Sequence, residues 1–246
     1  MRAPVISALL ILALSAAAAA PALAQGGLAC GPFTAAALAS PEPQPDAHFR
    51  QRLAEINSAV KSLRDRILFL GDSLTERWDP DIWQQHFAAR DAINAGINGD
   101  RTEHLLWRLD HGNLDGPPPP GVVLLIGTND LGHGREPETA AEGIRANLIR
   151  LRERLPQSRI LLVALPPRSQ DPQDRLRREV GAVNRLIAAC GDQREVLYAD
   201  IGGVLLDGQG RLTAPVSPDR LHFSALGYRK LAGQLDPLID RLLDGH

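Results

Sequence analysis

The sequence predicts a three-layer α/β fold, in which helices cover both faces of a parallel β-sheet. Short, continuously apolar runs alternate along the chain with longer segments whose apolar residues recur at helical spacing. Strands that are buried on both faces, as in a parallel sheet, are uniformly apolar rather than alternating. The chain has 246 residues, 44% hydrophobic and 23% charged, which is enough to form one large domain with a substantial core.

The predicted elements follow one another in a regular helix–strand order. The first half is expected to hold helices at about 48–63, 81–89 and 102–110, each followed by one of the strands 67–70, 92–94 and 122–126. Four prolines at 117–120 cannot be helical and lead an extended chain into the strand at 122–126, which we expect to be central. The second half is expected to hold helices at about 137–154 and 174–189, strands at 160–164 and 196–199, and a closing helix from about 225.

The N-terminal region predicts export. One positive charge precedes an apolar run that ends in a small-x-small pattern, so residues 1–24 are expected to be a signal peptide cleaved after Ala24. An uncleaved membrane anchor is the alternative, but the run is mostly weakly hydrophobic alanine and is interrupted by Pro21. Residues 25–47 are rich in Ala and Pro and predict a tether, and 48–246 predict the folded domain. We therefore expect a secreted or periplasmic protein without a stable membrane span after cleavage.

Charge and cysteine content narrow the function classes. Lys and Arg number 27 against 29 Asp and Glu, a net charge of -2, which does not favour binding to nucleic acid. Without a CxxC motif or closely spaced His and Cys, we expect no metal and no cofactor. His104 and His111 are expected at the surface of the predicted helix. Cys30 and Cys190 could form a disulfide in an oxidising compartment, or Cys190 could be buried with Cys30 free.

Polar motifs follow three of the predicted strands and precede the closing helix. They are GDSLT at 71–75, GINGD at 96–100, GTND at 127–130 and DRLH at 219–222. In open parallel sheets, ligands bind beyond the carboxyl ends of the strands, so we expect these motifs to meet at one edge. Together they hold the hydroxyl, imidazole, carboxylate and oxyanion donors that serine-dependent acyl transfer requires.

Each residue of this set has a candidate role and a simpler alternative. Ser73 is the candidate nucleophile, with a backbone N–H at a helix N-terminus, although a serine there can be only an N-cap. His222 is the candidate base and Asp219 its orienting carboxylate, unless the segment is a surface turn with a solvated histidine. The Gly99 N–H and the Asn129 side chain are candidate oxyanion donors, although such residues are common in turns.

Taken together, the blocks GDSLT, GINGD, GTND and DRLHF resemble the signature of the SGNH hydrolases, also called GDSL lipases and esterases. The stretch from Ile93 to Leu109 is similar to the branch of platelet-activating-factor acetylhydrolase-like proteins. The resemblance implies a flavodoxin-like five-stranded sheet in the order 2-1-3-4-5. It also implies a triad of Ser73, His222 and Asp219, and an oxyanion hole formed by Ser73, Gly99 and Asn129. The branch's best-known members are intracellular, whereas this chain is expected to be exported. For this reason we do not expect it to share their phospholipid substrate.

The sequence thus predicts a serine esterase that acts through an acyl-enzyme on small acyl esters, acetyl esters first among them. The enzymatic alternative is a lysophospholipase or acyl thioesterase for longer chains. A noncatalytic ligand-binding module on the same fold is the alternative of another class, but such a module needs no base placed against a hydroxyl. The alcohol part of the ester, whether small molecule, saccharide or lipid, and the oligomeric state are not predicted. Four aromatic residues could form a substrate platform or pack in the core: Trp78, Trp83, Trp107 and Phe223.

Overall fold

The computed structural model describes residues 30, 40–62 and 67–244 of the chain. The predicted signal peptide and its cleavage site after Ala24 lie outside the described residues. Within the described ranges, none of the helices is both long and apolar enough to cross a membrane.

The central sheet has the predicted topology. In the described part of the chain it consists of five parallel strands in the order β2-β1-β3-β4-β5. The strands are β1 (Ile67–Gly71), β2 (Ile93–Gly96), β3 (Gly121–Leu125), β4 (Arg159–Val163) and β5 (Val196–Ala199). The order 2-1-3-4-5 and the α/β class are therefore confirmed, with strand ends within one or two residues of those predicted.

Helices lie between the strands and cover both faces of the sheet. The α-helices are α1 (Ala47–Val60), α2 (Ser73–Glu76), α3 (Pro80–His86), α4 (Thr102–Leu109), α5 (Thr128–Gly132), α6 (Pro137–Arg154), α7 (Arg175–Ala188) and α8 (Ala225–Leu243). Two 3-10 turns, η1 (Ala88–Arg90) and η2 (Gly202–Leu205), follow α3 and β5. The predicted helix at 81–89 is therefore divided into α3 and η1. The helix start expected at Ser73 is confirmed as α2, whereas α5 was not predicted.

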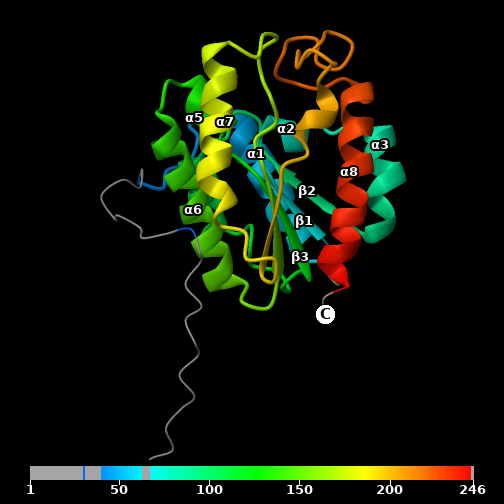
Figure 1. Ribbon diagram of the computed structural model, residues 1–246. Coiled ribbons are helices and arrows are strands. Elements are labelled where there is room, and N and C mark those ends of the chain that lie inside the picture. The colour runs from blue at the N-terminus through cyan, green and yellow to red at the C-terminus, as the bar shows by residue number, and fades with distance from the viewer. Residues whose placement is uncertain (1–29, 31–39, 63–66, 245–246) are drawn as a thin grey trace, which may run out of the picture.

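The two faces of the sheet bury separate hydrophobic clusters. In β1, Leu68 and Leu70 pack into a cluster with α1, α4, α6 and α7, whereas Ile67 and Phe69 pack into a second cluster with α3 and α8. Figure 1 shows this arrangement, with α6 and α7 on one side of the sheet and α3 and α8 on the other. Because both faces are covered, successive residues of the strands are mostly apolar, which explains the continuous runs in the sequence.

The N-terminal extension is attached to the domain at two described points. Cys30 forms a disulfide with Cys190, which follows α7, so the two cysteines are paired rather than free. Farther along, the Gln44 side chain is only 8% exposed and contacts the loop that follows β2. The extension was expected to be a plain tether, but residues 42–45 make specific contacts with the domain.

Candidate active site

Ser73 is the first residue of α2, which begins directly after β1. The N-cap of α2 is Asp72, whose carboxylate accepts a hydrogen bond from the Leu74 N–H at 2.8 Å, so the interpretation of Ser73 as an N-cap is wrong. The Ser73 N–H donates to no other group in the described ranges, as expected for the first turn of a helix. A Cβ atom at Gly96 would lie 2.2 Å from the Glu76 nitrogen, so this glycine allows α2 to pack against β2.

The candidate base and its carboxylate lie together in the turn before α8, and the base reaches Ser73. His222 Nε2 lies 3.0 Å from Ser73 Oγ, and His222 Nδ1 lies 2.7 Å from Asp219 Oδ2. The other Asp219 oxygen accepts from the His222 N–H at 2.7 Å. The turn needs a left-handed residue, Arg220, at a φ of 64°. Both ring nitrogens of His222 are thus engaged, which a freely solvated surface histidine would not show.

The contacts fix the tautomer that suits a base. Burial opposes ionisation of Asp219, but hydrogen bonds from the His222 ring and from the His222 and Leu221 N–H groups outweigh it and lower the pKa of Asp219 to about 2. An ionised Asp219 can only accept, so His222 Nδ1 is the donor of that contact. The neutral ring then presents a lone pair on Nε2 toward the Ser73 hydroxyl.

The two other candidate oxyanion donors, Gly99 and Asn129, each have an N–H group without an acceptor in the described part of the chain. Gly99 has a φ of 81°, which other residues rarely adopt, and its N–H has no acceptor within the described ranges. Asn129, in α5, donates one side-chain N–H to the Asp100 carbonyl at 2.9 Å. Because an amide nitrogen carries two hydrogens, this bond orients the Asn129 side chain and leaves its second N–H for a ligand.

A buried ion pair that the sequence did not indicate connects these loops. Asp100 and Arg108 are both fully buried, and Arg108 Nε lies 2.7 Å from Asp100 Oδ2. Arg108 also donates to the Gly71 carbonyl at the end of β1, at 2.9 Å. Burial raises the pKa of Asp100 to about 6, although the Arg108 charge opposes the rise. The only sequence signal was an arginine among the apolar residues of the predicted helix at 102–110.

The expectation that His104 lies at the surface is wrong, whereas His111 is exposed as expected. His104 is buried, and its Nδ1 accepts from the Arg101 N–H at 3.1 Å. Burial, followed by the Arg101 charge, lowers the pKa of His104 to about 4. Ligand atoms of Glu42, Glu103 and His104 come within 4.8 Å of one another, but the guanidinium groups of Arg101 and Arg135 already pair with Glu103, at 2.6 Å each. Because two cations already neutralise Glu103 and hydrogen-bond its carboxylate oxygens, the trio does not fit a metal site.

The four aromatic residues considered for a substrate platform divide between buried and half-buried positions. Trp78 and Phe223 are buried, and each contacts the Tyr228 ring, with centroid distances of 4.6 and 5.6 Å. Trp83 is half-buried against Phe69, and half-buried Trp107 stacks on His111. Trp83 and Trp107 are thus packing residues, whereas Trp78 and Phe223 also line an apolar cavity.

Asp72 has an unusual environment beside Ser73. It is 1% exposed, and its Oδ2 has no hydrogen-bond partner within the described ranges. Burial raises the pKa of Asp72 from 3.8 to about 7; the Leu74 N–H and Arg108 oppose the rise, and Asp100 and Asp130 add to it. The folded state therefore holds this proton more tightly than the unfolded chain does. The contribution of protonated Asp72 to the stability of the folded state is fully present below about pH 4. It is lost as the pH rises toward 7.

Replacing Asp72 with Asn is therefore expected to stabilise the protein most at high pH. Asn keeps a carbonyl oxygen for the Leu74 N–H but removes the charge that is buried above pH 7. Thermal unfolding of the variant and the wild type at pH 5 and pH 8 measures the effect. The melting temperature of the variant minus that of the wild type should be larger at pH 8 than at pH 5. Asp81→Asn, at an exposed acidic residue, is the matched control. Equal differences at both pH values would contradict the buried-charge explanation.

Comparisons with known proteins found a matching family, similar sequences and a similar fold. The model of a family described as "GDSL-like Lipase/Acylhydrolase family" matches residues 69–230. The human platelet-activating factor acetylhydrolase IB subunit alpha1 is 36% identical over 185 residues, covering 74% of this chain and 79% of that protein. The rat alpha2 subunit is 33% identical over 197 residues, covering 78% and 85%. A GDSL-like lipase structure from Bacteroides thetaiotaomicron matches with a TM-score of 0.66 at 20% identity, covering 78% of this chain and 97% of that chain, which shows a shared fold.

Proposed function

The chain belongs to the GDSL-like lipase/acylhydrolase family, and within that family of ester hydrolases we propose that it is a serine esterase for small acyl esters. The contact of His222 with both Ser73 and Asp219 is the observation that carries the proposal. A hydroxyl, an imidazole and a carboxylate in this order form the arrangement by which a serine is activated. A noncatalytic module would have no need for it.

The proposed reaction has two steps. Ser73 Oγ attacks the ester carbonyl while His222 Nε2 takes the hydroxyl proton, and Asp219 stabilises the imidazolium that forms. The Ser73 and Gly99 N–H groups and the Asn129 side chain stabilise the tetrahedral oxyanion. Collapse of this intermediate breaks the ester C–O bond, the alcohol leaves with the proton from His222, and water then hydrolyses the acyl-Ser73 ester by the same route.

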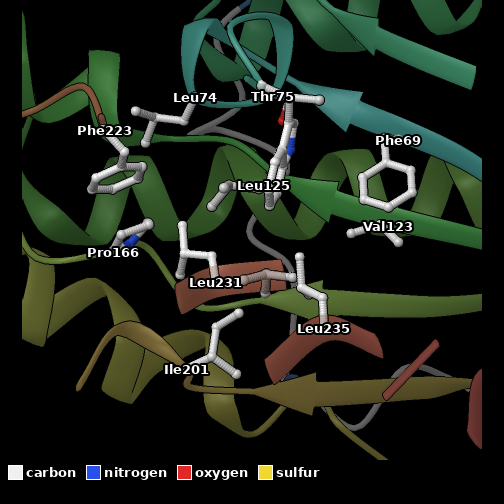
Figure 2. A pocket seen from close by; sticks show the side chains of 12 residues that line it. Phe69, Leu74, Thr75, Val123, Leu125, Pro166, Ile201, Phe223, Leu231 and Leu235 are labelled. Carbon is white, nitrogen blue, oxygen red and sulfur yellow. The ribbon is translucent and has the colours of Figure 1, made fainter. Parts of the chain in front are cut away.

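The space for the acyl group supports a short chain. An apolar cavity lies beneath the residues that follow the candidate nucleophile and base, Leu74 and Phe223 (Figure 2). Side chains from the sheet, including Leu125, and from α8, including Leu231 and Leu235, close it. Its volume is about 20 Å³, which is room for about one water-sized group, since one water needs roughly 10–15 Å³. The acetylhydrolase name of the curated relatives also supports an acetyl substrate.

We expect p-nitrophenyl acetate and butyrate to be hydrolysed with a higher kcat/KM than the decanoate or palmitate. Each methylene that an apolar groove accepts adds up to about 0.8 kcal/mol of binding, so a long groove would raise kcat/KM steeply with chain length. A cavity of about 20 Å³ holds little beyond an acetyl methyl group, so kcat/KM should reach a plateau or decline by about four carbons at the latest. Initial rates across the series measure this. An increase that continues through eight or ten carbons would contradict the small-acyl proposal and favour the lysophospholipase or thioesterase alternative.

We also propose that the protein is secreted or periplasmic. The small-x-small pattern before residue 25 supports this, as does the Cys30–Cys190 disulfide, a bond favoured in oxidising compartments. N-terminal sequencing of the protein recovered from the medium or periplasm tests the cleavage after Ala24.

A further inference from the structure

A polar pocket lies beside the candidate oxyanion loop, between the N-terminal extension and the domain. Its volume is about 550 Å³, within the range of roughly 300–1,000 Å³ typical of small-molecule sites. We call it the extension pocket; its polar lining residues are Glu42, Gln44, Arg101, His104 and His133. We propose that the extension pocket binds the alcohol portion of the ester, and that this portion is a neutral, hydroxyl-rich group such as a saccharide. The inference rests on the proposed esterase function.

The position of the extension pocket suits a group attached to the reacting ester. Gly99, whose N–H is a candidate oxyanion donor, lines the pocket directly. On the other side, the His133 ring contacts the Asn129 carbonyl through Nδ1 at 2.8 Å. The pocket therefore adjoins two of the residues proposed to hold the carbonyl oxygen. The apolar cavity for the acyl group is lined by a different set of residues, around Leu74 and Phe223.

The outer wall of the extension pocket is fixed to the domain. Gln44 Nε2 donates to Asp100 Oδ1 at 2.6 Å and to the Asn98 carbonyl at 3.2 Å, although these residues are more than 50 positions apart in the sequence. Two residues later, the Asp46 carboxylate caps α1 by accepting from the Phe49 N–H at 2.7 Å. Between these contacts the backbone is restricted further by proline. The wall is thus a preformed part of the site, as a binding surface requires.

The polar groups of the pocket favour hydroxyl groups as ligands. The Glu42 side chain is 61% exposed and lies 3.7 Å from Arg101, beyond hydrogen-bond distance, so its carboxylate can accept from a ligand. His133 Nδ1 must donate to the Asn129 carbonyl, which leaves Nε2 of the neutral ring as an acceptor. Gln44 Oε1 has no hydrogen-bond partner in the described ranges and is a third acceptor. Hydroxyl groups donate to such acceptors and also accept from the Arg101 guanidinium.

The charges of the pocket do not favour an ionic ligand. Glu42 and Arg101 balance each other, and His104, with a pKa of about 4, is uncharged at neutral pH. An anionic group would meet the Glu42 carboxylate and the acceptor atoms of Gln44 and His133. A quaternary ammonium group is favoured by an aromatic cage, and among the residues that the structure describes no Phe, Tyr or Trp lines this pocket. A neutral ligand with several hydroxyl groups fits the donor and acceptor set best.

Two acetyl esters that differ only in the alcohol test the inference. The probes are a methyl glucoside carrying one acetyl group and p-nitrophenyl acetate, and the readout is the ratio of their kcat/KM values. Glu42→Ala is expected to lower this ratio roughly tenfold, chiefly through the KM of the saccharide ester, because a hydrogen bond to a charged acceptor is lost. Glu42→Gln keeps one acceptor oxygen and should lower it less. Glu138→Ala, at an exposed glutamate of α6 outside the pocket, is the matched control and should leave the ratio unchanged. Intrinsic differences between the leaving groups cancel, because each ratio is compared with that of the wild type.

Unmodified methyl glucoside gives a second readout that needs no acyl transfer from the saccharide. It should inhibit hydrolysis of p-nitrophenyl acetate competitively, with an inhibition constant that rises in Glu42→Ala. An unchanged ratio and an unchanged inhibition constant in Glu42→Ala would overturn the inference while leaving the esterase proposal intact. Absence of hydrolysis of every ester by the wild type would instead overturn the proposed function. A preference for acetylcholine or an acetylated glycerol phosphate over the saccharide ester would assign the pocket to a charged alcohol and would also overturn the inference.

Discussion

Replacement of Ser73 with Ala is expected to lower kcat for ester hydrolysis by roughly 10⁴-fold or more, because it removes the atom that forms the acyl-enzyme. The same substitution should abolish covalent labelling by a fluorophosphonate probe. Such a probe reacts with a serine whose proton can pass to a neighbouring base, and His222 Nε2 lies 3.0 Å from Ser73 Oγ. Steady-state kinetics and intact mass of the labelled protein measure the two effects.

Ser62→Ala is the matched control for this experiment. Ser62 is exposed in the turn after α1, and its hydroxyl donates to the nearby Ala59 carbonyl. This variant should be labelled and should hydrolyse esters like the wild type. Labelling that persists in Ser73→Ala would place the reactive serine elsewhere. A folded wild type that takes up no probe would favour the noncatalytic alternative.

Replacement of Asn129 with Ala is expected to lower kcat by roughly 10² to 10³ while KM changes little. The free N–H of the Asn129 side chain is proposed to bind the tetrahedral oxyanion more strongly than the ground-state carbonyl, so its loss affects the transition state selectively. Its other N–H is held by the Asp100 carbonyl at 2.9 Å, which keeps the donor in place before substrate arrives. Michaelis–Menten kinetics with p-nitrophenyl acetate separate the two parameters.

Loss of the Asn129 amide can also destabilise the fold, and this effect must be separated from the effect on catalysis. Asn57→Ala removes the same side chain from α1, where it contacts Asn113 and the His111 carbonyl away from Ser73. A melting temperature shift in both variants with a loss of kcat only in Asn129→Ala would support the oxyanion role. A large rise in KM at constant kcat would instead assign Asn129 to substrate binding.

The strands and long helices were predictable because burial determines their pattern of apolar residues. Strands covered on both faces are continuous apolar runs, and helices covered on one face have apolar residues at helical spacing. The run at 122–126 corresponds to β3, and the closing helix begins at Ala225 as expected. By contrast, α5 was not predicted, and only the start of α2 at Ser73 was expected, because helices of five and four residues are too short to show a helical period. The helix predicted at 81–89 ends at His86, and a 3-10 turn follows it up to the left-handed residue Asp91, a local change that apolar spacing does not reveal.

The candidate site was predictable for residues of a reactive type that lie next to the end of a predicted strand or the start of a predicted helix. Asp219 and His222 are close in sequence, and Ser73 meets them across 149 positions because GDSLT follows a parallel strand and DRLH precedes α8. The contact of Gln44 with Asp100 spans 56 positions and starts in a proline-rich stretch without periodicity, so no pattern indicated it. His104 was misjudged because α4 is buried on nearly all sides, and its polar residues are satisfied by partners such as Arg101 rather than by water.

The Cys30–Cys190 disulfide changes the unfolded chain as well as the folded one. It joins positions that are 160 residues apart, so in the oxidised denatured chain a closed loop contains the segments that form α1 to α7, while β5, η2 and α8 follow it. Closing a loop of this length removes conformational entropy from the denatured state equivalent to about 5 kcal/mol in the chain-entropy model. That sum is comparable to the whole free energy of unfolding of a marginally stable domain. The wall of the extension pocket is therefore attached to a fold whose resistance to denaturation depends on the oxidation state of two sulfur atoms.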